Sequence, residues 1–318
     1  MADSIPSRPG QINKAGDDWA LFMKNYTSEV DAAFVENYKL DGRITVRTIQ
    51  SGKSAAFPAI GTVGSRYHVP GTDILGQTVD HNERILTLDP MLISDIFIAS
   101  IDEAMNHFDV RGEYTRQQGY ELARKRMQNE LRCAIRAARV TTSVVQGQPG
   151  GAVIKNINMA TSATALAAAF RSARQVFDEK NLSDNPSDYT GALRPAQYYL
   201  LTENKDLIDK DINTESKGSY NDAVIASVAR IPLLKVNCLP STNESADANV
   251  LSKYRGDYSD TVASVFHRNS VGTLQLLGLS VEDVYQGNKQ GTLMLSKYAL
   301  GHGELRADGA IEFSKAAP

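Results

Sequence analysis

The sequence is poor in the features that mark secreted, metal-binding or membrane-spanning proteins. Its 318 residues include only two cysteines, Cys133 and Cys238, too few and too far apart for a disulfide framework or a metal site. No run of about 18 or more apolar residues occurs, so we expect no membrane span. The first residues lack the basic-then-apolar pattern of a secretory signal. We therefore expect a soluble, non-secreted protein whose cysteines are buried free thiols.

Charge of one sign is not in excess either. The chain has 34 Lys and Arg against 37 Asp and Glu, a formal net charge of -3. A protein that grips nucleic acid along its length normally carries a basic excess, because neutralised phosphates supply most of that affinity. The balance argues against tight DNA binding, and it suits a container wall or a cytosolic enzyme equally well.

Motifs for catalysis and cofactor binding are scarce. Ser51-Gly52-Lys53-Ser54 resembles the end of a phosphate-binding loop, but Arg47 stands where that loop needs a glycine, and no helix visibly follows. The five histidines show no zinc-ligand spacing. No nucleophile elbow occurs, although a triad formed only in three dimensions would leave no local pattern. We predict no catalytic site, no metal and no cofactor.

The N-terminal part predicts a loose segment followed by a docking helix. Residues 1–16 are mostly small and polar and include two prolines, which is typical of a flexible arm. From Trp19 to Phe34 the apolar residues recur at helical spacing, behind suitable capping residues. That apolar face must pack on another surface. The residues expected to dock it are Trp19, Phe22 and Tyr26.

Two strand-like runs, Ile44–Gln50 and Arg84–Leu88, bracket a long stretch rich in glycine and proline. Such a long excursion is unusual in a compact enzyme. It is reasonable for a two-stranded arm that becomes ordered against another subunit, because an isolated hairpin is marginally stable in water.

A proline-free segment, Val110–Arg139, predicts a helix much longer than average, capped by Asp109. A short helix is expected before it, at Ile101–Asn106. The long helix carries eight basic residues against three acids. These charges are either an exposed face neutralised by ion pairs, or a basic ridge that faces DNA or a scaffold. The residues for the second interpretation are Arg124, Lys125, Arg126 and Arg132.

The remaining sequence predicts a mixed α and β region. Ser162 can cap a helix that extends to Phe177. The runs expected as strands are Val153–Ile157, Gln197–Thr202, Ile231–Asn237, Thr261–His267, Gly272–Leu277 and Thr292–Tyr298.

Five strings occur in a fixed order along the chain. They are Ser51-Gly-Lys-Ser-Ala-Ala-Phe-Pro58, Ile101-Asp-Glu-Ala-Met-Asn-His-Phe-Asp-Val-Arg111, Glu113-Tyr-Thr115, His267-Arg-Asn-Ser-Val-Gly-Thr273 and Lys297-Tyr-Ala-Leu-Gly-His-Gly-Glu-Leu-Arg306. Together they resemble the major capsid proteins of short-tailed, enteric- and cyanophage-type podoviruses.

The resemblance implies an α+β fold, that of tailed-phage and herpesvirus major capsid proteins. It implies an N-terminal arm with an amphipathic helix at 1–49, an extended β-hairpin loop at 50–82 and a peripheral domain with a spine helix at 83–145. An axial domain follows at 146–260, and peripheral-domain strands and the C-terminus at 261–318. The extended loop is expected to contact a neighbouring subunit. Its expected contact residues are Ser51, Lys53, Phe57, Ile60, Arg66, Tyr67, His68 and Val69.

The resemblance also implies a structural subunit without enzymatic activity. It would self-assemble into pentamers and hexamers of an icosahedral capsid around double-stranded DNA, with no membrane and no cofactor. Assembly would take place in the host cytoplasm. Expected partners are further copies of the chain, a scaffolding protein, a portal at one vertex, weakly bound packaged DNA and a decoration protein.

Two hypotheses from other classes stay open at this stage. One is a cytosolic α/β enzyme with a mobile flap at 50–82, which would form a small closed oligomer. The other is a nucleic-acid-binding protein that uses the basic helix, against which the net charge of -3 argues.

Overall fold

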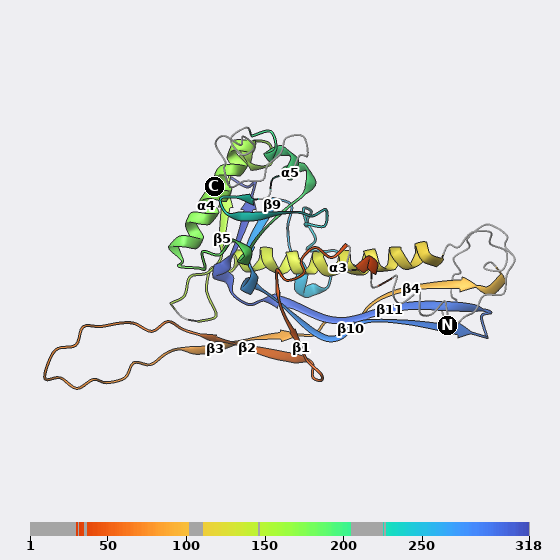
Figure 1. The fold of residues 1–318 in the computed structure, drawn as a ribbon, viewed down its shortest axis with the longest axis horizontal. Helices are drawn as coiled ribbons and strands as arrows, with labels where there is room; N and C mark the ends of the chain where they lie inside the picture. Colours follow the sequence, from red (N-terminus) through yellow and green to blue (C-terminus); the bar gives the residue numbers. More distant parts are fainter. Residues whose placement is uncertain are drawn as a thin grey trace.

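A long helix, α3 (Arg111–Arg139), runs through the middle of an elongated molecule (Figure 1). The computed structural model describes residues 30, 32–34, 37–101, 111–145, 147–204, 225 and 227–317. The 29 residues of α3 correspond to about 44 Å of helix. Glu113 in the first turn and Arg136 and Arg139 in the last complement the helix dipole. The predicted long helix is confirmed.

A four-stranded sheet packs against α3 over much of its length. Its order is β1 (Thr45–Thr48), β10 (Val271–Gln286), β11 (Gly291–Glu304) and β4 (Leu92–Ala99). β1 pairs with β10 in parallel, and the other pairs are antiparallel. Apolar residues of α3 enter a shared core with strand residues such as Tyr298 and Leu300.

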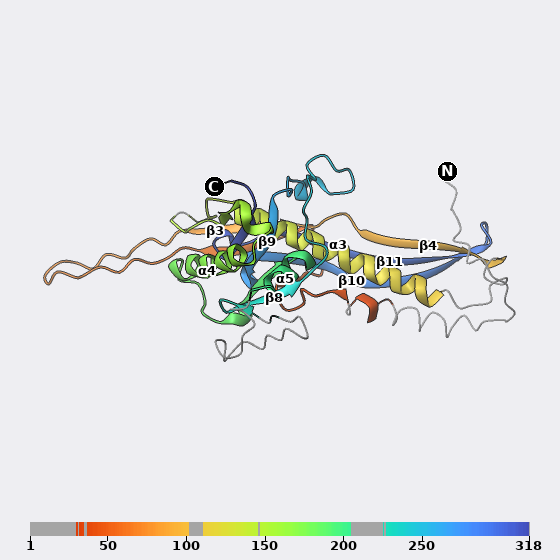
Figure 2. The same ribbon diagram turned by 90° about the horizontal axis from the view of Figure 1, so that it is seen from above.

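A six-stranded sheet lies at the C-terminal half of α3. Its order is β5 (Ala152–Lys155), β12 (Ala310–Ser314), β9 (Thr261–His267), β6 (Tyr189–Leu193), β8 (Ile231–Lys235) and β7 (Ser227–Val228). Two helices accompany it, α4 (Ala163–Glu179) and α5 (Pro195–Leu201). Figures 1 and 2 show both on the side of the sheet away from α3. Phe170, Phe177 and Phe313 are fully buried in this second core.

A two-stranded hairpin projects from the body at one end (Figure 1). It consists of β2 (Ser54–Ile60) and β3 (His81–Thr87), paired antiparallel from Ser54 and Thr87 to Ile60 and His81. The predicted arm is present, but its first strand is not Ile44–Gln50. That segment forms β1 and pairs with β10, because its neighbour in space comes from the far end of the chain.

Local expectations in the rest of the chain mostly agree with the structure. Ser162 caps α4 by accepting a hydrogen bond from the amide of Ala165, as predicted. Both cysteines are buried and free, and burial raises the pKa of the Cys238 thiol to about 11. The strand predicted at Gln197–Thr202 is wrong, since this segment forms α5. Pro195 opens that helix, and buried Tyr198 and Leu201 lie three apart on one helical face.

The expected division of the chain at residues 260 and 261 does not follow the sheets. β9 and β12, both beyond residue 260, lie in the six-stranded sheet with β5, β6 and β8. Only β10 and β11 of that C-terminal section enter the four-stranded sheet. The C-terminal section therefore belongs to both halves of the body and links them.

The predicted N-terminal helix is described only near its end. Val30, Ala33 and Phe34 are helical and buried. The docking residues Trp19, Phe22 and Tyr26 lie outside the described residues, as do the capping residue Asp109 and nearly all of Ile101–Asn106.

Candidate inter-subunit surfaces

The arm exposes large apolar side chains that no core of its own subunit covers. Six of them are between 62% and 103% exposed: Ile60, Val63, Tyr67, Val69, Ile74 and Leu75. Few contacts hold the arm beyond its strands. Gly61 and Asp80 are joined by one backbone hydrogen bond of 2.8 Å, and Arg66 donates to the carbonyl of Leu75 at 2.6 Å. Apolar surface of this kind marks a site where another molecule binds.

The structure places all eight predicted contact residues on the arm or at its base. Phe57 is half-buried, and the other seven are exposed: Ser51, Lys53, Ile60, Arg66, Tyr67, His68 and Val69. Whether they contact a neighbour stays a prediction. The sequence reasoning missed Val63, Ile74 and Leu75, although apolar residues among turn formers were a usable signal.

The base of the arm is anchored to the body on both sides. Arg47 donates to the carbonyl of Ala56 at 2.7 Å, and its guanidinium lies 5.4 Å from the centre of the Phe57 ring. Arg84 forms an ion pair with Glu304 on β11. The arm thus has a fixed root and a distal part held by few bonds.

The loop after α3 grips the arm farther out. Asn82 donates to the carbonyl of Val144 at 2.7 Å, and Gln148 donates to the carbonyl of Ile60 at 3.2 Å. A pocket of about 260 Å³ lies between this loop, the hairpin and the segment around Leu305. The direction of the arm is therefore set by contacts with the end of the long helix.

Side-chain contacts contradict half of the proposed basic ridge. Arg126 is 6% exposed and Arg132 3% exposed, and each is paired with a carboxylate. A buried, paired guanidinium is not available to DNA or a scaffold, so the ridge is wrong for these two residues. Arg124 is exposed and pairs with Glu121, while Lys125 donates to the carbonyl of Asn249. For those two the proposal stays open.

Arg126 belongs to a buried polar cluster centred on Glu130. The Glu130 carboxylate accepts from Arg126 at 2.9 Å, from Tyr38 at 2.9 Å and from Thr273 at 3.2 Å. Arg126 also donates to the hydroxyl of Tyr298 at 2.7 Å. The N-terminal segment, the long helix and two strands of the four-stranded sheet therefore meet at one ionised group.

His302 extends the same cluster through Thr273. The Nδ1 of His302 lies 2.9 Å from the Thr273 hydroxyl, which itself donates to Glu130. An Nδ1–H donor on His302 satisfies both contacts. Burial, with Arg126 and Lys253 nearby, lowers the pKa of His302 well below its usual value. The imidazole therefore acts as a neutral structural donor.

The C-terminal end of α3 is tied to the six-stranded sheet by a second buried carboxylate. Arg139 donates to Glu312 on β12 through two nitrogens, at 2.6 Å and 2.7 Å. Thr261 on β9 donates to the same carboxylate at 2.6 Å. A fork of two parallel bonds fixes geometry as well as charge, so α3 holds both sheets in one frame.

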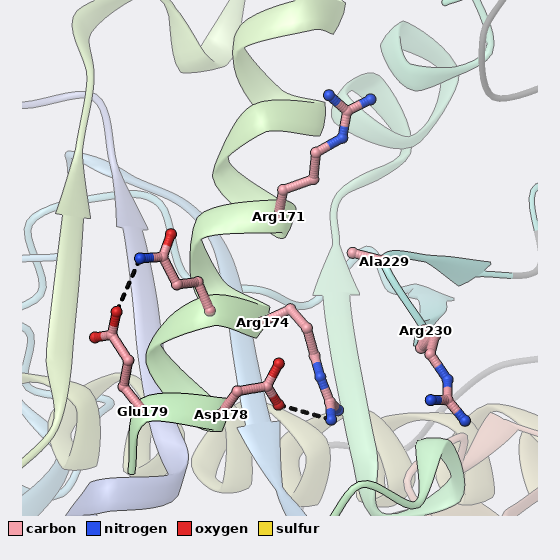
Figure 3. A pocket seen from close by; sticks show the side chains of 7 residues that line it. Arg171, Arg174, Asp178, Glu179, Ala229 and Arg230 are labelled. Atoms are coloured by element: carbon pink, nitrogen blue, oxygen red, sulfur yellow. Dashed lines mark hydrogen bonds and ion pairs between the residues drawn. The ribbon is translucent and has the colours of Figure 1, made fainter. Parts of the chain in front are cut away.

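The pocket drawn in Figure 3 lies between α4 and the turn that joins β7 and β8. Arg174 pairs with Asp178 at 2.8 Å, and Arg171 points away from both. The lining contains no serine, cysteine or histidine that could serve as nucleophile or base. Ala229 and Arg230 both have positive φ, 50° and 62°, which makes this turn strained.

Searches for other chemistry gave little within the described residues. No group of three or more His, Cys, Asp or Glu side chains there could hold a metal ion. No helix in the described part of the chain is long and apolar enough to cross a membrane. An anchored body with an apolar arm defines the class of protein: a subunit that interlocks with others.

Comparison with known proteins identifies the family. The chain belongs to the Gp10A-like major capsid protein family, whose model matches residues 56–314. It is 30% identical to the major capsid protein of Escherichia phage T7 over 336 residues, which cover 94% of this chain and 93% of that protein. The predicted resemblance is confirmed.

Solved structures agree with this assignment. The capsid structure of the cyanophage P-SCSP1u is 34% identical, with a TM-score of 0.79 over 98% of this chain and 92% of that one. The mature capsid of bacteriophage PhiM1 is 14% identical, with a TM-score of 0.75 over 99% and 92%, which supports the fold. The α+β tailed-phage capsid fold is confirmed. The chain is a structural subunit of a phage capsid and not an enzyme.

Proposed function

We propose that the chain forms the pentamers and hexamers of an icosahedral capsid, with the arm at residues 50–82 lying over an adjacent subunit. The observation that carries this is the exposed apolar surface of the arm, together with its anchored base. A neighbouring subunit would cover side chains such as Val69, Ile74 and Leu75. Repeated around closed rings, modest contacts of this kind give a stable shell.

The energetics of the arm favour assembly over an isolated folded state. Burying one large aliphatic side chain completely contributes about 1.5–3 kcal/mol. Ordering the distal arm costs roughly 1–2 kcal/mol per residue, which offsets much of that gain. The contact is therefore weak in a single pair of subunits and becomes effective in a lattice.

The two halves of the body suggest two domains. The peripheral domain would comprise α3 and the four-stranded sheet, and the axial domain would comprise the six-stranded sheet with α4 and α5. This assignment gives β9 and β12 to the axial domain. The N-terminal arm, residues 1–49, would dock through Trp19, Phe22 and Tyr26.

Other partners follow from the family rather than from contacts. We include a scaffolding protein during assembly, a portal at one vertex and a decoration protein, with assembly in the host cytoplasm. The net charge of -3 supports only weak contact with the packaged double-stranded DNA.

Electron microscopy tests this proposal. The chain is co-produced with the scaffolding protein of its phage, and the fast-sedimenting fraction is imaged. Closed shells with five-fold and six-fold capsomers are expected, with each arm resting on the next subunit. A homogeneous small oligomer under all conditions would contradict the proposal.

A further inference from the structure

Three cations gather where the N-terminal segment crosses α3 beside β8. Lys39, Arg124 and Lys235 are all exposed, and we call them the Lys39 patch. Lys39 and Arg124 line one small pocket together with Asn237. The ammonium of Lys39 lies 3.5 Å from the main-chain carbonyl of Lys235. Figure 2 shows the segment after Asn37 running beside α3 and β8.

The two lysines are held in place by neutral groups. Lys39 donates to a carbonyl, and Lys235 donates to the Tyr199 hydroxyl at 2.9 Å. The Lys235 ammonium also lies 4.9 Å from the centre of the Tyr199 ring. A cation fixed by neutral acceptors keeps its full charge, whereas an ion pair cancels it.

The cations of α3 differ in this respect. Arg126, Arg132 and Arg139 each bind a carboxylate within 3 Å or less of a guanidinium nitrogen. Among the described residues, neither lysine of the patch has a carboxylate within salt-bridge distance, and Arg124 has only the exposed Glu121. The uncompensated positive charge therefore lies on this patch and not along the long helix.

We propose that the Lys39 patch contacts the phosphate backbone of the packaged DNA. This inference rests on the proposed function, because it requires a shell that encloses DNA. The patch is open and polar, and its exposed rings are Tyr120 and Tyr199. A helix from a scaffolding protein would need an apolar groove for its apolar face, which this patch lacks. Phosphate groups need only exposed cations.

Duplex binding by the purified, unassembled subunit tests the inference. The triple variant Lys39→Gln, Arg124→Gln and Lys235→Gln is compared with Lys155→Gln, Arg171→Gln and Lys315→Gln. The control changes three exposed cations elsewhere and alters net charge equally. The probe is a random-sequence duplex, titrated at several salt concentrations. The patch variant should bind roughly tenfold more weakly at low salt, and its salt slope should fall by about 2.7.

Three results would overturn the inference. Equal loss in both triple variants would mean that net charge alone governs binding. Unchanged DNA binding in the patch variant would remove the contact. Unchanged DNA binding with loss of scaffold-driven assembly would assign the patch to a protein partner. Shell formation by the wild-type chain is scored in parallel, so failure of the proposed function is recognised by absent shells whatever the DNA result.

Discussion

The phenol of Tyr38 donates a hydrogen bond of 2.9 Å to the carboxylate of Glu130, across 92 positions of sequence. Burial, and then the nearby Glu130 charge, raise the pKa of Tyr38, so the phenol stays protonated as a donor. The guanidinium of Arg126 lies 4.0 Å from the centre of the same Tyr38 ring. This contact joins the N-terminal segment to the long helix.

Replacing Glu130 with Gln should strongly destabilise the subunit. The change leaves the Arg126 guanidinium buried without a counter-charge, which costs about 3–5 kcal/mol. The free energy of unfolding of the unassembled subunit, from denaturant titration, measures it. Glu121→Gln, which breaks an exposed pair with Arg124, should cost less than about 1 kcal/mol. Equal losses in the two variants would contradict the account of this cluster.

Stability should fall as the pH is lowered from neutral toward 5. The unfolded chain takes up a proton on His302 below its ordinary pKa of about 6.5, whereas the folded state does not, because its pKa there is lowered. Stability present above that pH is then lost at up to about 1.4 kcal/mol per pH unit. Thermal melts from pH 7.5 downward would measure the slope, and His302→Gln should reduce it.

Tyr298→Phe is the matched control for that slope. It removes the bond from Arg126 but keeps His302, so it should lower stability without flattening the pH dependence. An identical slope in wild type and the His302 variant would show that other groups carry the effect.

Gly119→Ala should loosen the N-terminal segment. In an ordinary helix this change stabilises by about 1 kcal/mol. Here a Cβ on Gly119 would lie 2.7 Å from the carbonyl oxygen of Val30 and 2.8 Å from the Cβ of Ala33. Limited proteolysis should cut the segment near these residues faster. Gln117→Ala, on the exposed face, should leave the cutting rate unchanged, and equal rates in all three proteins would refute the close packing.

Asn82→Ala should free the arm without unfolding the body. The variant loses the bond to the Val144 carbonyl that links β3 to the loop after α3. Amide hydrogen exchange in β2 and β3 should accelerate severalfold, while the unfolding free energy changes by less than about 0.5 kcal/mol. Glu83→Gln, an exposed neighbour on the same strand, serves as control. Unchanged exchange in Asn82→Ala would show that the arm is held elsewhere.

The sequence predicted those elements whose signal is local. α3 was readable because no proline interrupts its apolar stripe, and β9 was readable as an unbroken apolar run. α5 was missed because Tyr198-Tyr199-Leu200-Leu201 has the composition of a strand, and its packing against α4 decides the outcome. Local pattern was enough for type, and not for conflicts of this kind.

Long-range pairings could not be read from the sequence. The parallel contact of β1 with β10 joins segments more than 200 positions apart in the numbering. Arg124 and Arg126 are indistinguishable as charges along the helix, yet one is exposed and the other is buried against Tyr38 and Tyr298. Only the positions of those distant rings determine which arginine can meet a partner.

Shortening the arm tests the central claim most directly. Thr62–Val79 is replaced by an Asn-Gly turn, which closes the hairpin where Gly61 already bonds to Asp80 and leaves β2 and β3 intact. The variant and the wild type are each made with the scaffolding protein and compared by sedimentation and electron microscopy. The account predicts that the variant melts like the wild type but forms no closed shells. Normal particles from the shortened chain would contradict it.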